Sequence, residues 1–214
     1  MKKLLIGLFL VSSVLAFSER VVKGDKAYAD DKGIVYVEGE KTPYTGVIEG
    51  YNEQGKLEGK ANYKDGKMNG FSKLYYPSGK LQSEATFKDN VQDGVQKDYF
   101  EDGKVKLELP YKNGKPEGTT KEFYPNGILK RETVYVNDGT TSKNIKYFPN
   151  GKIKLEVNFV DGHMEGPYKE YHSNEKLFKE CFYNEKGKLE GNYKEYDVEG
   201  NLLKEVTYKN GVEI

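Results

Sequence analysis

The chain has 214 residues, of which 36% are hydrophobic and 32% charged, so it lacks the apolar material of a deep globular core. Its 34 basic side chains are balanced by 34 acidic ones, which excludes a general attraction to nucleic acid. Aromatic residues make up 13%, with 18 Tyr, 10 Phe and no Trp, and this composition favours a single layer of sheet over a sphere.

The first 18 residues have the pattern of a secretory signal peptide. Two lysines precede an apolar run from Leu4 to Leu15, and small residues at the end of that run fit a signal-peptidase site. The run is shorter than the roughly 20 apolar residues that cross a membrane as a helix. We therefore expect export to the periplasm, the cell surface or the medium, with the mature chain beginning at Phe17 or Glu19 and containing no transmembrane span. A retained membrane anchor is the alternative. Cleavage removes two of the 34 basic residues and leaves a net charge near −2.

Residues 19–45 are predicted to form an N-terminal cap and a leading strand, followed by a repeat array over residues 46–214. The array has a period of 24 residues, and only its sixth copy is one residue longer. The seven copies begin at Gly46, Gly70, Gly94, Gly118, Ser142, Gly166 and Gly191. When each start is counted as position zero, positions five and seventeen are always aromatic, position eleven is always aliphatic, and position nine is glycine except at Glu175. A unit this small cannot bury its own apolar face, so the copies must stack.

Each copy has the pattern of a β-hairpin. In the copy that begins at Gly70, two aromatic-rich runs flank the turn Pro77–Lys80, which predicts a four-residue loop over positions seven to ten. Asp-Gly and Asn-Gly pairs such as Asp65-Gly66 then supply a second tight turn to the next copy. About seven hairpins in series predict an all-β fold, an elongated, single-layer, twisted antiparallel meander of about 14 strands.

Charged residues follow the same period. Position three is lysine in five copies and position fourteen is glutamate in six copies. A four-residue loop would place these two positions directly opposite each other in the hairpin, where they can pair. Exposed pairs of this kind contribute little stability. We expect them to maintain strand register and solubility.

The copies share the pattern Gly-x-x-Lys-x-Tyr-Tyr-x-x-Gly-Lys-Leu-x-x-Glu-x-x-Tyr-Lys-Asn-Gly-Lys-x-x. This unit resembles the MORN repeat, in the variant form found in bacterial proteins, and the resemblance covers residues 34–214. The segment from Ile34 to Gly46 is similar to the opening of the YwqK-type proteins, which are labelled toxin–antitoxin antitoxins. The first resemblance implies a scaffold that presents a surface to proteins or lipids. The second implies a cytoplasmic toxin as the partner.

The residues that usually carry chemistry are few. The chain has two histidines, His163 and His172, and a single cysteine, Cys181, at a position where other copies have small core residues. A zinc site would need carboxylates to complete it, and glutamates that recur in six copies are not expected to be catalytic. We therefore predict no enzyme, no catalytic residue, no metal site and no cofactor.

The remaining candidate is a row of aromatic side chains at position six. Because neighbouring residues of a strand point to opposite faces, this row should face away from the invariant aromatic row at position five. Exposed aromatic patches usually mark contact sites. The candidate binding residues are Tyr76, Phe100, Tyr124, Phe148 and His172. The alternative is that both rows only shield the backbone of a thin sheet.

The sequence therefore favours an exported, non-catalytic repeat scaffold that binds a protein partner. Two alternatives remain open: an antitoxin-like protein that neutralises a toxin by binding it, and a cell-envelope module whose aromatic rows contact a glycan or a lipid.

Overall fold

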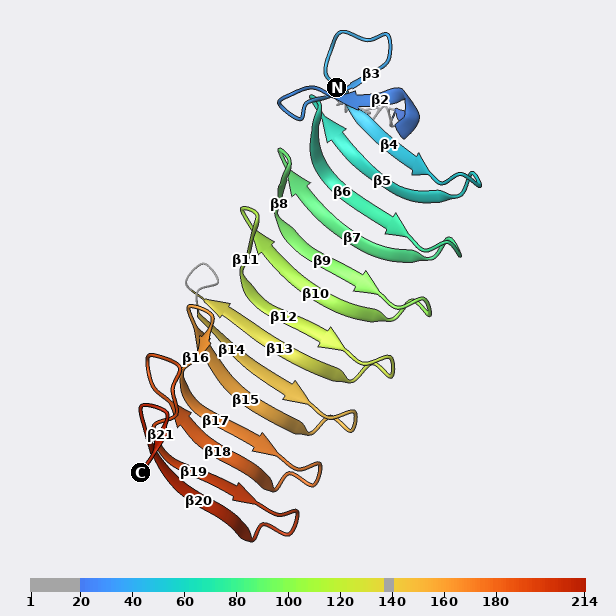
Figure 1. The fold of residues 1–214 in the computed structure, drawn as a ribbon. Coiled ribbons are helices and arrows are strands. Elements are labelled where there is room, and N and C mark those ends of the chain that lie inside the picture. Colours follow the sequence, from blue (N-terminus) through green and yellow to red (C-terminus); the bar gives the residue numbers. More distant parts are fainter. Residues whose placement is uncertain (1–19, 137–140) are drawn as a thin grey trace, which may run out of the picture.

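The computed structural model describes residues 20–136 and 141–214, so the predicted signal peptide lies outside the described residues. The predicted all-β fold is confirmed: seven hairpins follow one another along an elongated single layer, with the first hairpin (β4 and β5) and the last (β19 and β20) at opposite ends of the array (Figure 1). The hairpins are β4 (Gly46–Tyr51) with β5 (Leu57–Lys64), β6 (Lys67–Tyr75) with β7 (Leu81–Lys88), β9 (Gly94–Tyr99) with β10 (Val105–Lys112), β12 (Gly118–Phe123) with β13 (Leu129–Val136), β14 (Thr141–Tyr147) with β15 (Ile153–Val160), β17 (Gly166–Tyr171) with β18 (Leu177–Tyr183), and β19 (Gly191–Tyr196) with β20 (Leu202–Lys209). The two-residue strands β8 (Val91–Gln92), β11 (Lys115–Pro116), β16 (His163–Met164) and β21 (Val212–Glu213) extend the second turns.

The first turn of each hairpin differs from its prediction by one residue. In the second hairpin the Tyr76 amide donates to the Lys80 carbonyl oxygen at 2.8 Å, and the Gly79 amide donates to the Tyr76 carbonyl oxygen at 2.8 Å. The loop therefore contains three residues, not four, and Gly79 closes it with a φ of +83°. Glycine adopts this left-handed conformation without the steric cost that a Cβ brings.

A β-bulge restores the register that the shorter loop removes. Tyr75 pairs with Leu81, whereas Leu74 pairs with Ser83, so Gln82 is an extra residue on the returning strand. As a result Lys73 lies opposite Glu84, as predicted. The prediction of the charge pairing was correct, although the loop length on which it rested was wrong.

Among the described residues, the second turns after β5, β7, β10, β15 and β20 are two-residue turns in which both residues have positive φ, whereas a three-residue loop that ends at Gly187 follows β18. Asp65 and Gly66 have φ values of +49° and +76°, and Asn113 and Gly114 have +49° and +78°. This is the type I′ geometry that Asn-Gly and Asp-Gly favour in tight hairpins. The predicted turn residues at these places are confirmed.

The N-terminal segment adds a small cap at the first hairpin. β1 (Val21–Lys23) pairs with β4 in parallel, whereas the other strand pairs that the structure describes are antiparallel. A 3₁₀ turn, η1 (Gly24–Lys26), leads to a separate pair of strands, β2 (Ala27–Ala29) and β3 (Val35–Val37). Tyr44 joins cap and array: its ring is only 1% exposed, and its hydroxyl lies 2.9 Å from the carbonyl oxygens of both Arg20 and Val47.

Strand pairing divides the array into two faces. Directly paired residues share a face, so positions two, four, thirteen, fifteen and seventeen form one face, which we call the groove face. Positions one, three, five, fourteen and sixteen form the other, which we call the ladder face. The residues that are most buried at the middle of the groove face are Ala61, Thr120, Thr133, Val157 and Cys181. Burial raises the pKa of the Cys181 thiol, as expected for a small core residue.

Candidate interaction surfaces

The predicted row at position six lies at the start of each first turn, and its side chains are half-buried. Three members form hydrogen bonds to the backbone of the next hairpin. These contacts are Tyr76 hydroxyl to Tyr99 carbonyl at 2.6 Å, Tyr124 hydroxyl to Tyr147 carbonyl at 2.8 Å, and His172 Nε2 to Tyr196 carbonyl at 3.0 Å. The row therefore joins consecutive hairpins. That these residues also bind a partner stays a prediction.

Phe100 and Phe148 occupy the same row without a hydroxyl to donate. Two strands separate successive members, which places them about 10 Å apart along the array. The Lys154 ammonium lies 5.6 Å from the centre of the Phe148 ring, and the Lys130 ammonium lies 6.0 Å from that of Tyr124. Phe148 thus presents a ring together with a positive charge to a partner that approaches this edge, whereas the Lys130 ammonium beside Tyr124 is paired with Glu122 at 2.6 Å.

On the ladder face, lysines and glutamates alternate from strand to strand. The pairing runs Lys73, Glu84, Lys97, Glu108, Lys121, Glu132, then Ile145, then Glu156, Lys169, Glu180, Lys194 and Glu205. Ion pairs within hairpins include Lys73–Glu84 at 3.3 Å and Lys194–Glu205 at 3.2 Å. The alternation was predicted only within hairpins; from the second hairpin on it also crosses from each hairpin to the next, except at Ile145. Between the first and second hairpins Lys60 lies opposite Lys73, so two like charges face each other there.

Tyrosines at position five connect this ladder to the following copy. The Tyr99 hydroxyl donates to Glu84 Oε1 at 2.6 Å, and the Tyr196 hydroxyl donates to Glu180 Oε1 at 3.0 Å. Burial and the Glu84 carboxylate raise the pKa of Tyr99 to about 12. The Tyr99 hydrogen bond, together with the Lys73 ammonium, lowers the pKa of Glu84. The ladder carboxylates are thus engaged within the protein, which favours a structural role for this face.

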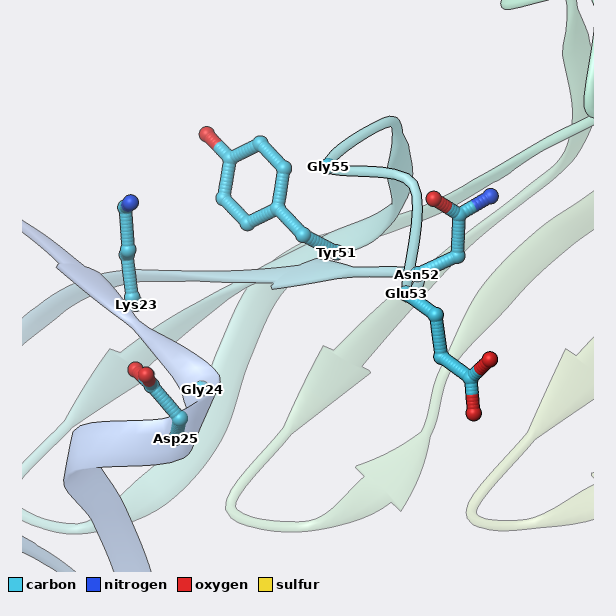
Figure 2. A pocket seen from close by; sticks show the side chains of 7 residues that line it. All are labelled: Lys23, Gly24, Asp25, Tyr51, Asn52, Glu53 and Gly55. Carbon is cyan, nitrogen blue, oxygen red and sulfur yellow. The ribbon is translucent and has the colours of Figure 1, made fainter.

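A pocket of about 400 Å³ lies between the cap and the first hairpin (Figure 2). It is lined by Lys23, Gly24 and Asp25 from the cap and by Tyr51, Asn52, Glu53 and Gly55 from the hairpin. The Lys23 ammonium lies 5.5 Å from the centre of the Tyr51 ring, and the Tyr51 hydroxyl donates to Glu49 Oε2 at 2.6 Å. In Figure 2 the Asp25 and Glu53 carboxylates point away from each other, so they do not converge on a common ligand.

A second hollow, of about 330 Å³, lies on the groove face across the fourth and fifth copies. Its lining contains Thr120, Arg131, Thr133, Tyr135, Ser142, Asn144, Phe159 and Gly162. Thr133 Oγ1 donates to Asn144 Oδ1 at 2.8 Å, and Asn144 Nδ2 donates to Ser142 Oγ at 3.1 Å. We call this hollow the polar groove. Its residues were not predicted as a site, although Thr133 and Ser142 both depart from the residues that other copies have at their positions.

The side chains capable of metal chemistry do not gather in the described part of the chain. Over residues 20–136 and 141–214, no cluster of three or more His, Cys, Asp or Glu side chains is arranged to hold a metal ion. His163 Nε2 instead lies 2.8 Å from the Glu185 carbonyl oxygen in a turn. In the same described ranges, no helix is long and apolar enough to span a membrane.

Comparison with protein families finds seven matches to the model described as "MORN repeat variant". They cover residues 44–65, 68–89, 92–113, 116–137, 143–161, 164–185 and 189–210. These are the seven hairpins of the array, and together they account for more than half of the chain. No curated protein sequence matches the chain.

Among solved structures, the chain is similar over part of its length to two crystal structures of TarM. One is a point mutant of S. aureus TarM in complex with Fondaparinux, alpha-GlcNAc-glycerol and UDP, with 16% identity and a TM-score of 0.31 over 45% of this chain. The other, described as TarM, has 17% identity and the same TM-score over 46% of this chain. The similarity spans 19% of the length of TarM in both cases.

Proposed function

The chain belongs to the family of MORN repeat variants, and from this premise we propose that it is an exported, non-catalytic scaffold that binds a protein partner through its position-six row. MORN repeats are in general modules of protein and membrane interaction. The observation that carries the proposal is the row itself, in which aromatic side chains recur at one edge of the sheet in five consecutive hairpins, from Tyr76 to His172. Such a surface offers many similar, additive contacts to a partner that lies along the array.

Phe100 and Phe148 are the members of the row best suited to test it. They make none of the hydroxyl contacts that Tyr76 and Tyr124 make with the next hairpin, so changing them perturbs the array less. A photocrosslinking phenylalanine analogue placed at either residue should capture the partner in the native host. The same analogue at Val95, which is 46% exposed on the ladder face, is the matched control. Equal capture from Val95 and from the row would refute the assignment of the row.

Formation of the crosslinked adduct with the partner should also depend on the aromatic rings of the position-six row. Unlabelled wild-type protein should compete for capture, whereas a variant that carries Phe100→Ala and Phe148→Ala should compete less well at the same concentration. Circular dichroism establishes that this variant stays folded. If the double variant competes as well as the wild type, the rings do not contribute to binding.

Export is the second part of the proposal, and the apolar run from Leu4 to Leu15 supports it. The intact mass of the protein recovered from its native host should correspond to a chain that begins at Phe17 or Glu19. An antitoxin-like protein acting on a cytoplasmic toxin would instead keep Met1 or Lys2 and remain in the cytoplasmic fraction. The mass and the fraction together decide between the two functions.

A further inference from the structure

The polar groove lies where the array departs from its own period. Position fifteen, in the middle of the groove face, is Ala, Leu, Val or Cys in six copies and threonine only in the fourth, at Thr133. Position zero is glycine in six copies and serine only in the fifth, at Ser142. These two departures lie on neighbouring strands, since Thr133 pairs with Asn144 and Ser142 pairs with Tyr135. Residues from two copies thus combine in one place.

The floor of the groove contains a polar atom without a partner. Thr120 is 7% exposed, and among the described residues its Oγ1 has no hydrogen-bond partner. Thr120 pairs with Thr133, which is 6% exposed and directs its own hydroxyl to Asn144. Apolar side chains fill the same row at Leu109 and Val157. An unpaired buried hydroxyl opposes folding, so its presence here indicates a role other than packing.

The walls add apolar faces to this polar floor. Ser142 pairs with Tyr135 on one side and with Phe159 on the other, so it lies between two aromatic residues that both line the groove. A row of hydroxyl and amide groups beside flat rings suits a molecule that has hydroxyl groups around its edge and C–H bonds on its face. A pyranose has this shape and this distribution of polarity. The volume of about 330 Å³ is at the lower end of small-molecule sites.

The charges at the groove favour a neutral ligand. Arg131 is the only arginine of the array, and its guanidinium Nη2 lies 3.1 Å from Glu122 Oε2, while the Lys130 ammonium lies 2.6 Å from Glu122 Oε1. Glu122 therefore already engages the Arg131 guanidinium, the one charged side chain that lines the groove among the described residues, and weakens its attraction to a phosphate or carboxylate. The polar floor in turn disfavours an acyl chain.

We propose that the polar groove is a glycan-binding site that takes one neutral pyranose unit. The sugar hydroxyls contact the chain formed by Thr133, Asn144 and Ser142, and the sugar face packs against Tyr135 or Phe159. This site shares no residue with the position-six row and does not depend on the protein-binding function proposed above.

The test uses chitotriose, cellotriose and maltotriose as probes, with trialanine as a neutral peptide control. Saturation-transfer NMR and calorimetry on the whole chain should detect binding of at least one of the three sugars and none of trialanine. Asn144→Ala and Thr133→Val should each weaken that binding at least tenfold. Ser72→Ala, a polar residue of the groove face in the second copy, is the matched control and should leave it unchanged.

Thr133→Val guards against loss of fold, because valine is the residue that the fifth and seventh copies have at this position. Its far-ultraviolet circular dichroism and melting temperature should match those of the wild type. Absence of binding by all three sugars would overturn the proposal. Undiminished sugar binding by both Thr133→Val and Asn144→Ala, or binding of trialanine that the same two changes abolish, would overturn it as well.

Discussion

Replacing Glu175 by glycine is expected to stabilise the protein. Glu175 stands at position nine, where the other six copies have glycine, and its φ is +72°. A side chain in the left-handed region costs about 1–2 kcal/mol. The change also removes the ion pair between Glu175 Oε2 and Lys152 Nζ at 3.0 Å, whose side chains are 65% and 39% exposed. An exposed pair of this kind contributes about 0–1 kcal/mol, so we expect a net gain of about 1 kcal/mol.

Two further variants separate backbone strain from the lost charge. Glu175→Ala removes the same ion pair but keeps a Cβ in the strained conformation, so it should not stabilise. Gly103→Ala makes the opposite change in the third hairpin. Gly103 has a φ of +87°, and a Cβ added there would meet no atom within 4 Å, so the cost is purely conformational. We expect Gly103→Ala to destabilise by about 1–2 kcal/mol.

Urea unfolding followed by far-ultraviolet circular dichroism measures all three changes. A gain of 1 kcal/mol in a domain of this size also raises the melting temperature by about 2–4 °C. If Glu175→Gly and Glu175→Ala have the same stability, strain at this residue is not what the glycine relieves. If Gly103→Ala costs nothing, the explanation of the glycine at position nine fails for the whole array.

Three further outcomes test other parts of the structure. Deleting Gly94–Glu117, one full period, should leave a folded β-protein, because Lys121 can then pair with Glu84 as Lys97 does now. A protein that lacks only the first 12 of these residues should unfold, and equal loss of stability in both deletion variants would contradict the repeat array. Thr120→Val should raise the free energy of unfolding by about 1–3 kcal/mol, since it removes an unpaired buried hydroxyl; a loss of stability on urea unfolding would show that this hydroxyl is satisfied. The free energy of unfolding should fall as pH rises from 10 to 12, because the pKa of tyrosine is about 10 in the unfolded chain and about 12 for Tyr99 in the folded one, so the folded state keeps its proton to higher pH. Tyr99→Phe should make this pH dependence less steep, and an unchanged dependence would exclude Tyr99 as a contributor.

The hairpins, their number and the residues of the two-residue second turns followed from the sequence, because alternation, glycine and Asn-Gly pairs act locally. The length of the first loop did not. The distance in sequence from Tyr75 to Glu84 sets only the sum of loop and strand residues, and a three-residue loop plus a bulge at Gln82 has the same sum as a four-residue loop. A periodic sequence therefore predicts which residues face each other better than it predicts the turn between them.

The contacts between hairpins were harder to predict from the sequence. The Tyr76 hydroxyl bonds to a carbonyl 23 residues later, and that contact depends on how far each hairpin is displaced along its neighbour. The alternation of residue types along a strand carries no information about this displacement. For the same reason the polar groove was missed: Thr133 and Asn144 are 11 residues apart in sequence and meet only because β13 and β14 pair in that register.

In a repeat protein, residues that every copy shares are those that every copy needs for stacking. The position-five tyrosines and the position-fourteen glutamates, which most copies share, fit this rule, since Tyr99 and Tyr196 donate to Glu84 and Glu180 of the preceding hairpin. A residue that only one copy has is not required for stacking, and a single substitution of this kind can arise by neutral drift of the sequence. Thr133 and Ser142 are departures of different copies, yet both line one hollow and both bond to the same side chain, Asn144. Drift in two separate copies has no reason to converge on one amide, whereas binding of one ligand does.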